Sequence, residues 1–127
     1  SKEKMTWQKW SKAAVDEARK NGHAVLVDFT ADWCLTGQAN RKTSIEVKAV
    51  REKLDAIGAI AFSGDYTKAD SAITKELERY KRVGVPLTII YPANPEAEPI
   101  VLPELLTPAA VVEALNKAAQ ELVGNKP

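Results

Sequence analysis

The segment Ala24-Val25-Leu26-Val27-Asp28-Phe29-Thr30-Ala31-Asp32-Trp33-Cys34 decides how this chain folds. Residues 24–29 form a short run that is apolar except for Asp28, which is typical of a strand buried in a parallel sheet. Residues 30–34 turn out of that strand, and a helix is predicted to begin at Cys34. The single cysteine of the chain is therefore expected at a turn from strand to helix.

On either side of this segment, helical and strand patterns alternate along the chain. A helix is predicted over 6–20, because Thr6 is a capping residue and Trp7 and Trp10 fall on one helical face. Later helices are predicted from Cys34, from a Ser44 cap to Gly58, over 73–80 and over 107–124; the later strands are predicted over 59–63, 87–91 and 100–102. This order predicts an α/β fold with a four-stranded mixed sheet, helices on both faces and an extra N-terminal helix.

Length, charge and cysteine content exclude several classes of protein. With 127 residues, 45% hydrophobic and 28% charged, the chain is expected to form one globular domain over 1–127. A net charge of +1 gives no electrostatic footprint for nucleic acid. One cysteine and one histidine allow neither an internal disulfide nor a structural zinc site. No apolar run approaches the ~18 residues of a membrane span, and the polar start at Ser1 predicts a processed or excised soluble domain.

Residues near Cys34 point to sulfur chemistry. Free backbone N–H groups at a helix start stabilise a thiolate, the form that attacks disulfides. Trp33 is expected to shield one side of the sulfur. Burial in an apolar strand would raise the pKa of Asp28 and suit it to proton transfer. Val85-Pro86 precedes a predicted strand, where a cis proline would expose an unpaired strand edge.

These residues carry a resemblance to a known family. Residues 25–36 and the Gly84-Val85-Pro86-Leu87 block resemble the thioredoxin superfamily, and most of all the C-terminal thioredoxin-like domain of the thiol:disulfide interchange protein DsbD and related cytochrome c biogenesis proteins. The resemblance extends over about residues 7–122 and also includes Asp65-Tyr66-Thr67. It implies a thioredoxin fold and thiol–disulfide exchange, with Cys34 as nucleophile and Trp33, Val85 and Pro86 shaping the partner-binding edge.

The same resemblance implies a cellular setting. The redox group would be the cysteine itself, with no metal, nucleotide or flavin cofactor. Partners would be protein disulfides or thiols, together with a transmembrane electron-donor domain of the same parent protein. The domain would face the periplasm of a bacterial cell envelope, without inserting into the membrane or binding nucleic acid.

The chain departs from the family at two positions. The family motif is Cys-x-x-Cys, whereas this chain reads Cys34-Leu35-Thr36-Gly37, so Gly37 stands in place of the resolving cysteine. Cys34 can still attack a disulfide, but the resulting mixed disulfide has no internal thiol to release it. Because position 37 lies one helical turn after Cys34, Gly37→Cys is expected to restore the internal disulfide. Arg41, where the family often has an acidic residue, is expected to favour the thiolate.

Two other functions remain open from the sequence. One is a non-catalytic thioredoxin-like module that binds partners along the Pro86 edge and has an inert, buried Cys34. The other is a monothiol exchange enzyme that uses glutathione as the external resolving thiol. For Asp28 the alternative is a hydrogen-bonded structural carboxylate, and for His23 a surface position is expected.

Overall fold

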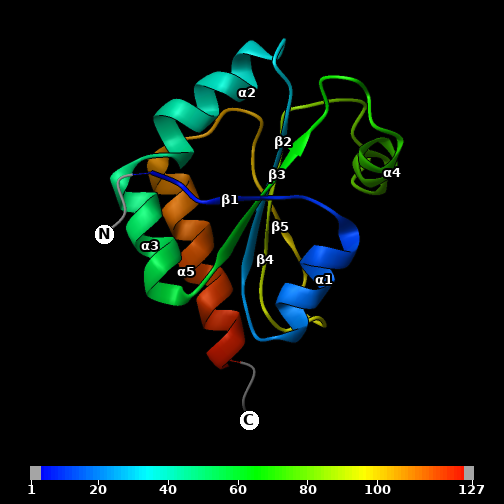
Figure 1. Cartoon of the computed structure of the whole chain (residues 1–127). Coiled ribbons are helices and arrows are strands. Elements are labelled where there is room, and N and C mark those ends of the chain that lie inside the picture. Colours follow the sequence, from blue (N-terminus) through cyan, green and yellow to red (C-terminus); the bar gives the residue numbers. More distant parts are fainter. Residues whose placement is uncertain (1–3, 125–127) are drawn as a thin grey trace.

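A computed structural model describes the backbone of residues 4–124 and the side chains of residues 4–120. Within that range, five strands form one sheet with the order β1-β3-β2-β4-β5 (Figure 1). The strands are β1 (Trp7–Lys9), β2 (Val25–Thr30), β3 (Ile60–Asp65), β4 (Leu87–Tyr91) and β5 (Ile100–Val101). β1, β3 and β2 run parallel to one another, while β2, β4 and β5 alternate in direction. The sheet is therefore mixed, as predicted.

Helices cover both faces of the sheet, which confirms the predicted α/β layering. Figure 1 shows α3 and α5 on one side of the sheet, and α1 and α4 on the other. The helical segments are α1 (Lys12–Lys20), α2 (Leu35–Asn40), the π-helical turn η1 (Arg41–Ile45), α3 (Lys48–Ile57), α4 (Ser71–Arg79) and α5 (Pro108–Gly124). Among the described residues, no helix combines the length and the hydropathy needed to cross a bilayer.

Strand β2 runs through the centre of the molecule, and all six of its residues are buried. Val25, Val27 and Phe29 pack in the apolar cluster that lies under α1 and α4, whereas Leu26 belongs to the cluster under α3 and α5. Since side chains alternate along a strand, Asp28 and Thr30 share the face of Leu26. The two polar residues of β2 therefore face the layer that contains α2 and η1.

The prediction of four strands is wrong, because the N-terminal segment starts as a strand. Trp7–Lys9 pairs in parallel with Ala61–Ser63, and α1 begins only after Ser11, whose hydroxyl accepts a hydrogen bond from the Ala14 N–H at 3.0 Å. Trp10 is buried and meets the ring of Phe29 edge-on at 5.1 Å. The two tryptophans therefore do not share one face of a helix. Trp7 lies in the edge strand β1, and Trp10 directly follows that strand.

The segment between α2 and α3 also differs from the expectation. Ser44 was expected to cap a helix, but it lies inside η1, and its buried hydroxyl donates a hydrogen bond to the Leu106 carbonyl at 3.0 Å. α3 starts after Val47, without a side-chain cap. The π-helical turn closes with a hydrogen bond from the Glu46 N–H to the Arg41 carbonyl at 2.7 Å. This turn directs Arg41 toward the sheet.

Candidate functional site

Cys34 lies where β2 ends and α2 begins, at the position predicted from the sequence. It is the N-cap residue of α2, and its Sγ accepts a hydrogen bond from the Gly37 N–H at 3.3 Å. The residue is only 7% exposed, whereas its neighbours Trp33 and Leu35 are 59% and 84% exposed. Cys34 is therefore nearly covered, while the residues before and after it in the sequence extend apolar side chains into solvent.

The loop after β3 holds the Trp33 segment in place. The Asp32 N–H donates to the Thr67 hydroxyl at 2.9 Å, and the Trp33 ring N–H donates to the Thr67 carbonyl at 3.2 Å. Thr67 is fixed in turn by hydrogen bonds from its N–H and hydroxyl to Asp65, and these lower the pKa of Asp65. Thr67 was not among the residues predicted for the site; the Asp65-Tyr66-Thr67 run, which resembles the family, is the sequence signal that points to it.

Val85 and Pro86 lie at the same end of the sheet as the Cys34 turn. In the antiparallel pairing of β2 with β4, Phe29 is opposite Leu87, so the next position along β2, Thr30, corresponds to Pro86. The Val85–Pro86 peptide bond is cis. Val85 is partly exposed and Pro86 is buried. The register thus brings the two sequence-predicted segments to the same end of the sheet.

Asp28 is the centre of a buried hydrogen-bond network. Its Oδ2 accepts a hydrogen bond from Arg41 Nε at 2.7 Å, and its Oδ1 accepts one from the Thr88 hydroxyl at 2.8 Å. Arg41 also donates to the Ser63 hydroxyl at 2.7 Å and lies over the Trp7 ring at 4.2 Å. Arg41 was predicted to favour the thiolate of Cys34, but its hydrogen bonds join it to Asp28 and Ser63. Nothing in the sequence around Arg41 or Asp28 indicated that these two residues, which lie in different elements, form an ion pair.

Burial raises the pKa of Asp28 above its ordinary value of about 3.8, and the charge and hydrogen bond of Arg41 offset part of that rise. A carboxyl whose pKa is higher in the folded than in the unfolded state contributes stability that is fully present below about pH 4. That contribution is lost as the pH rises through the folded-state pKa.

The pH dependence of stability should therefore differ between the wild type and Asp28→Asn, which has no group to titrate at this position. We expect the free energy of unfolding of the wild type, relative to the variant, to fall as the pH is raised from about 4. Urea unfolding of both proteins from pH 4 to pH 8 measures this difference. A difference that stays constant, or that grows in favour of the wild type, would contradict the raised pKa.

Gly37 has a neighbour that the sequence did not reveal. A Cβ built on Gly37 would lie 3.2 Å from Cys34 Sγ and 3.0 Å from Thr30 Cβ, and would overlap the Thr30 hydroxyl oxygen. The side chain of Thr30 therefore fills the space that the Cβ of a second cysteine would take. The prediction that Gly37→Cys alone restores the disulfide did not include this overlap.

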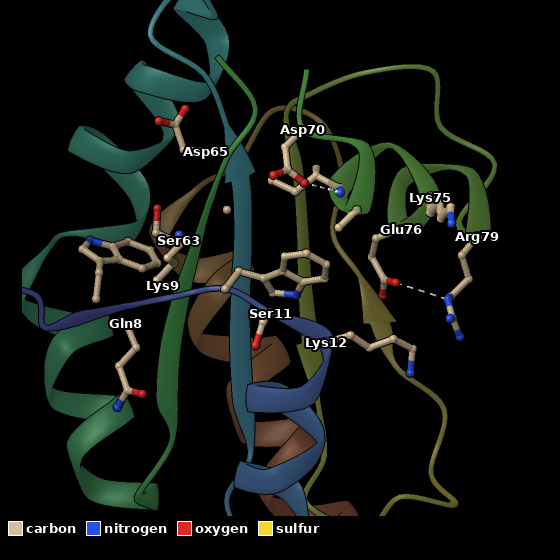
Figure 2. Close-up of a pocket in the computed structure, with 15 residues that line it drawn as sticks. Gln8, Lys9, Ser11, Lys12, Ser63, Asp65, Asp70, Lys75, Glu76 and Arg79 are labelled. Atoms are coloured by element: carbon tan, nitrogen blue, oxygen red, sulfur yellow. Dashed lines mark hydrogen bonds and ion pairs between the residues drawn. The ribbon is translucent and has the colours of Figure 1, made fainter. Parts of the chain in front are cut away.

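A large groove lies away from this sulfur site. It has a volume of about 770 Å³ and is bordered by β1, the end of β3 and α4, and its lining residues include Trp7, Trp10 and Ile73 but not Cys34, Trp33 or Pro86. Figure 2 shows the ion pair between Glu76 and Arg79 on its α4 wall. Within the described part of the chain, no three His, Cys, Asp or Glu side chains gather as a set of metal ligands.

Comparisons with known proteins agree with this fold. The chain is 30% identical over 108 residues to thiol:disulfide interchange protein DsbD 1 of Pseudomonas aeruginosa; the match covers 84% of this chain and 18% of that protein. The C-terminal domain of DsbD from Neisseria meningitidis, in its reduced form, superposes with a TM-score of 0.67 at 18% identity, covering 87% of this chain and 99% of that one. A structure of DsbH oxidoreductase has a TM-score of 0.69 at 17% identity and covers 91% of this chain and 85% of its own.

The chain spans about a fifth of the length of the first of these relatives. A family model described as thioredoxin-like matches residues 6–93, which include β1 to β4, the Cys34 turn and the Val85–Pro86 bond. The match thus extends over more than half of the sequence and contains every residue assigned above to the sulfur site. The chain belongs to the thioredoxin-like family.

Proposed function

We propose that this domain carries out thiol–disulfide exchange, of the protein-disulfide reductase type, through Cys34. The observation that carries the proposal is the placement of Cys34: its sulfur caps a helix start and accepts a backbone N–H hydrogen bond from Gly37, and its sequence neighbours Trp33 and Leu35 are exposed. Backbone N–H groups at such a position favour the thiolate, which is the attacking form. The resemblance to DsbD supports the same chemistry.

The proposed reaction has a first step that the chain can perform by itself. The Cys34 thiolate attacks one sulfur of a partner disulfide; a new S–S bond forms to Cys34 as the partner's bond breaks, and the released partner thiolate takes a proton from solvent. Because position 37 is glycine, no internal thiol can attack this mixed disulfide. The domain is therefore expected to stall as a mixed disulfide until an external thiol attacks it.

Four further residues have proposed roles around this step. Trp33, Val85 and Pro86 are proposed to form the surface where a partner chain docks. The register supports this, because Leu87 is opposite Phe29, near the end of β2 from which the turn to Cys34 leads. Asp28 is proposed to assist proton transfer, because its raised pKa lies closer to the working pH than that of an ordinary aspartate. Its hydrogen bond to Arg41 opposes protonation, so the two residues together set how readily this carboxyl accepts a proton.

The proposed partners and location follow from the DsbD relatives. We infer that the partners are protein disulfides or thiols, and that a transmembrane domain of the same parent protein supplies electrons. The domain would then face the periplasm of a bacterial cell envelope. DsbD-like chains that are several times longer than this one support a larger parent protein.

Oxidised glutathione tests the proposed function directly. The folded wild type should gain one glutathione on Cys34, visible by intact mass, and should keep it after excess reagent is removed, because no internal thiol displaces it. Reduced glutathione should release the adduct. Cys34→Ser should gain nothing, since this is the only cysteine of the chain.

Urea-unfolded wild type is the control for an inert cysteine. If the folded protein forms no adduct while the unfolded chain does, Cys34 is a buried structural residue and the binding-module function replaces the exchange function. If the wild type catalyses insulin reduction only when reduced glutathione is present, the domain works as a monothiol enzyme with glutathione as the resolving thiol.

A further inference from the structure

The hydroxyl of Thr30 is a buried polar group that lacks a partner. Thr30 is 5% exposed, and among the described residues its Oγ1 is the one buried side-chain nitrogen or oxygen without a hydrogen bond. Buried hydroxyls are normally paired, because an unmade hydrogen bond in the interior costs stability. An orphaned hydroxyl beside a reactive centre therefore calls for a functional explanation.

Thr30 points toward the sulfur site. It is the last residue of β2 and lies on the strand face that also bears Asp28. The point where a Cβ of residue 37 would sit is overlapped by Thr30 Oγ1 and lies 3.2 Å from Cys34 Sγ. The hydroxyl and the sulfur thus border the same small space. A side chain at position 37 would occupy it, and glycine leaves it free.

We propose that Thr30 is a positioning residue that replaces the absent second cysteine: its hydroxyl donates a hydrogen bond to Cys34 Sγ when the sulfur carries negative charge. This inference rests on the exchange function proposed above and assigns the group that stabilises the sulfur there. The Gly37 N–H already donates to Sγ at 3.3 Å, so the Thr30 hydroxyl would be a second donor on the same atom.

The charge state of the sulfur explains why this hydrogen bond forms during the reaction. A thiol is a weak acceptor. A thiolate is charged, and hydrogen bonds to ionised groups are shorter and stronger than those between neutral groups. Cys34 is a thiolate twice in the cycle. It is the nucleophile when the mixed disulfide forms, and it is the leaving group when an external thiolate attacks the partner sulfur and breaks the bond to Cys34.

Substitutions at Thr30 separate this role from packing. Thr30→Val keeps the branched shape and loses the hydroxyl, whereas Thr30→Ser keeps the hydroxyl. We expect alkylation of Cys34 by iodoacetamide at pH 7 to slow roughly tenfold in Thr30→Val, and its pH profile to move to higher pH, because the thiolate loses a charge-assisted donor. Thr30→Ser should react within about twofold of the wild type.

Stability supplies the second readout. Removal of an unpaired buried hydroxyl should leave Thr30→Val at least as stable as the wild type in urea, so slower alkylation cannot be assigned to unfolding. Thr43→Val is the matched control, since it removes a threonine hydroxyl that donates to the Ala39 carbonyl at 2.8 Å in an exposed turn. Its alkylation rate should equal that of the wild type.

The outcomes distinguish this inference from the function on which it rests. If the wild type forms the glutathione adduct but Thr30→Val alkylates at the wild-type rate with the same pH profile, the role of Thr30 is overturned and the exchange function stands. If Thr30→Ser slows as much as Thr30→Val, shape and not the hydroxyl controls the sulfur, which also overturns it. If the folded wild type forms no adduct, the exchange function itself fails.

Discussion

Gly37→Cys alone should form little internal disulfide, and the double variant Thr30→Ala/Gly37→Cys should form it readily. The new Cβ would overlap the Thr30 hydroxyl, and forcing extra atoms into a packed site costs about 1–3 kcal/mol of stability. Alanine at position 30 removes the overlapping oxygen and leaves its own Cβ 3.0 Å from the new Cβ, a contact that a shift of a few tenths of an ångström relieves. The remaining distance of 3.2 Å from the new Cβ to Cys34 Sγ suits an S–S bond of about 2.05 Å.

Thiol titration after oxidation, together with urea unfolding, measures both effects. The double variant should lose its two free thiols on oxidation, regain them with a dithiol reagent and catalyse insulin reduction without glutathione. Thr30→Ala alone is the matched control, which retains one thiol throughout. If the single variant oxidises as readily as the double variant and is equally stable, Thr30 is not the obstacle. If neither variant forms the disulfide, the conclusion that a cysteine at position 37 comes within bonding distance of Cys34 Sγ is wrong.

Arg41→Met should lower the free energy of unfolding by about 3–5 kcal/mol near neutral pH. The side chain of Asp28 is 1% exposed and that of Arg41 is 18% exposed, so loss of the cation leaves a buried carboxylate without its charged partner. The raised pKa of Asp28 determines how this cost varies with pH. Protonation relieves the carboxylate, so the loss of stability should be smallest near pH 4 and should grow as the pH rises.

Urea unfolding at pH 4 and pH 8 tests this prediction. Lys42→Met removes the neighbouring, exposed cation and should change stability by no more than about 0.5 kcal/mol. Asp28→Asn/Arg41→Met removes both charges and should regain much of the stability that Arg41→Met loses, because no buried charge is left unpaired. If Arg41→Met is as stable as the wild type at both pH values, the ion pair does not contribute to the free energy of unfolding, and the prediction is wrong.

Local patterns in the sequence were sufficient for the central part of the fold. The apolar run of β2, the turn at Cys34 and the strand after Val85-Pro86 each carry a signal within a few residues, and the helices on both faces followed from periodicity. The edge strand β1 was missed because three residues give too short a pattern. Pairing with β3 decides its conformation, and the helical spacing of Trp7 and Trp10 suggested a helix instead.

The sequence by itself determined the chemistry that is available: one cysteine after an Asp-Trp turn, no second thiol at position 37, and an aspartate within a buried strand. Only the tertiary structure decided which groups meet. Arg41 comes from the turn after α2 and Thr88 from β4, yet both bind Asp28; Thr30 lies seven residues before Gly37, yet its hydroxyl fills the space beside it. The physical reason is that hydrogen bonds and steric exclusion act over a few ångströms in space. Sequence periodicity specifies which face a residue occupies, whereas the packing of one element on another decides which atoms that face meets.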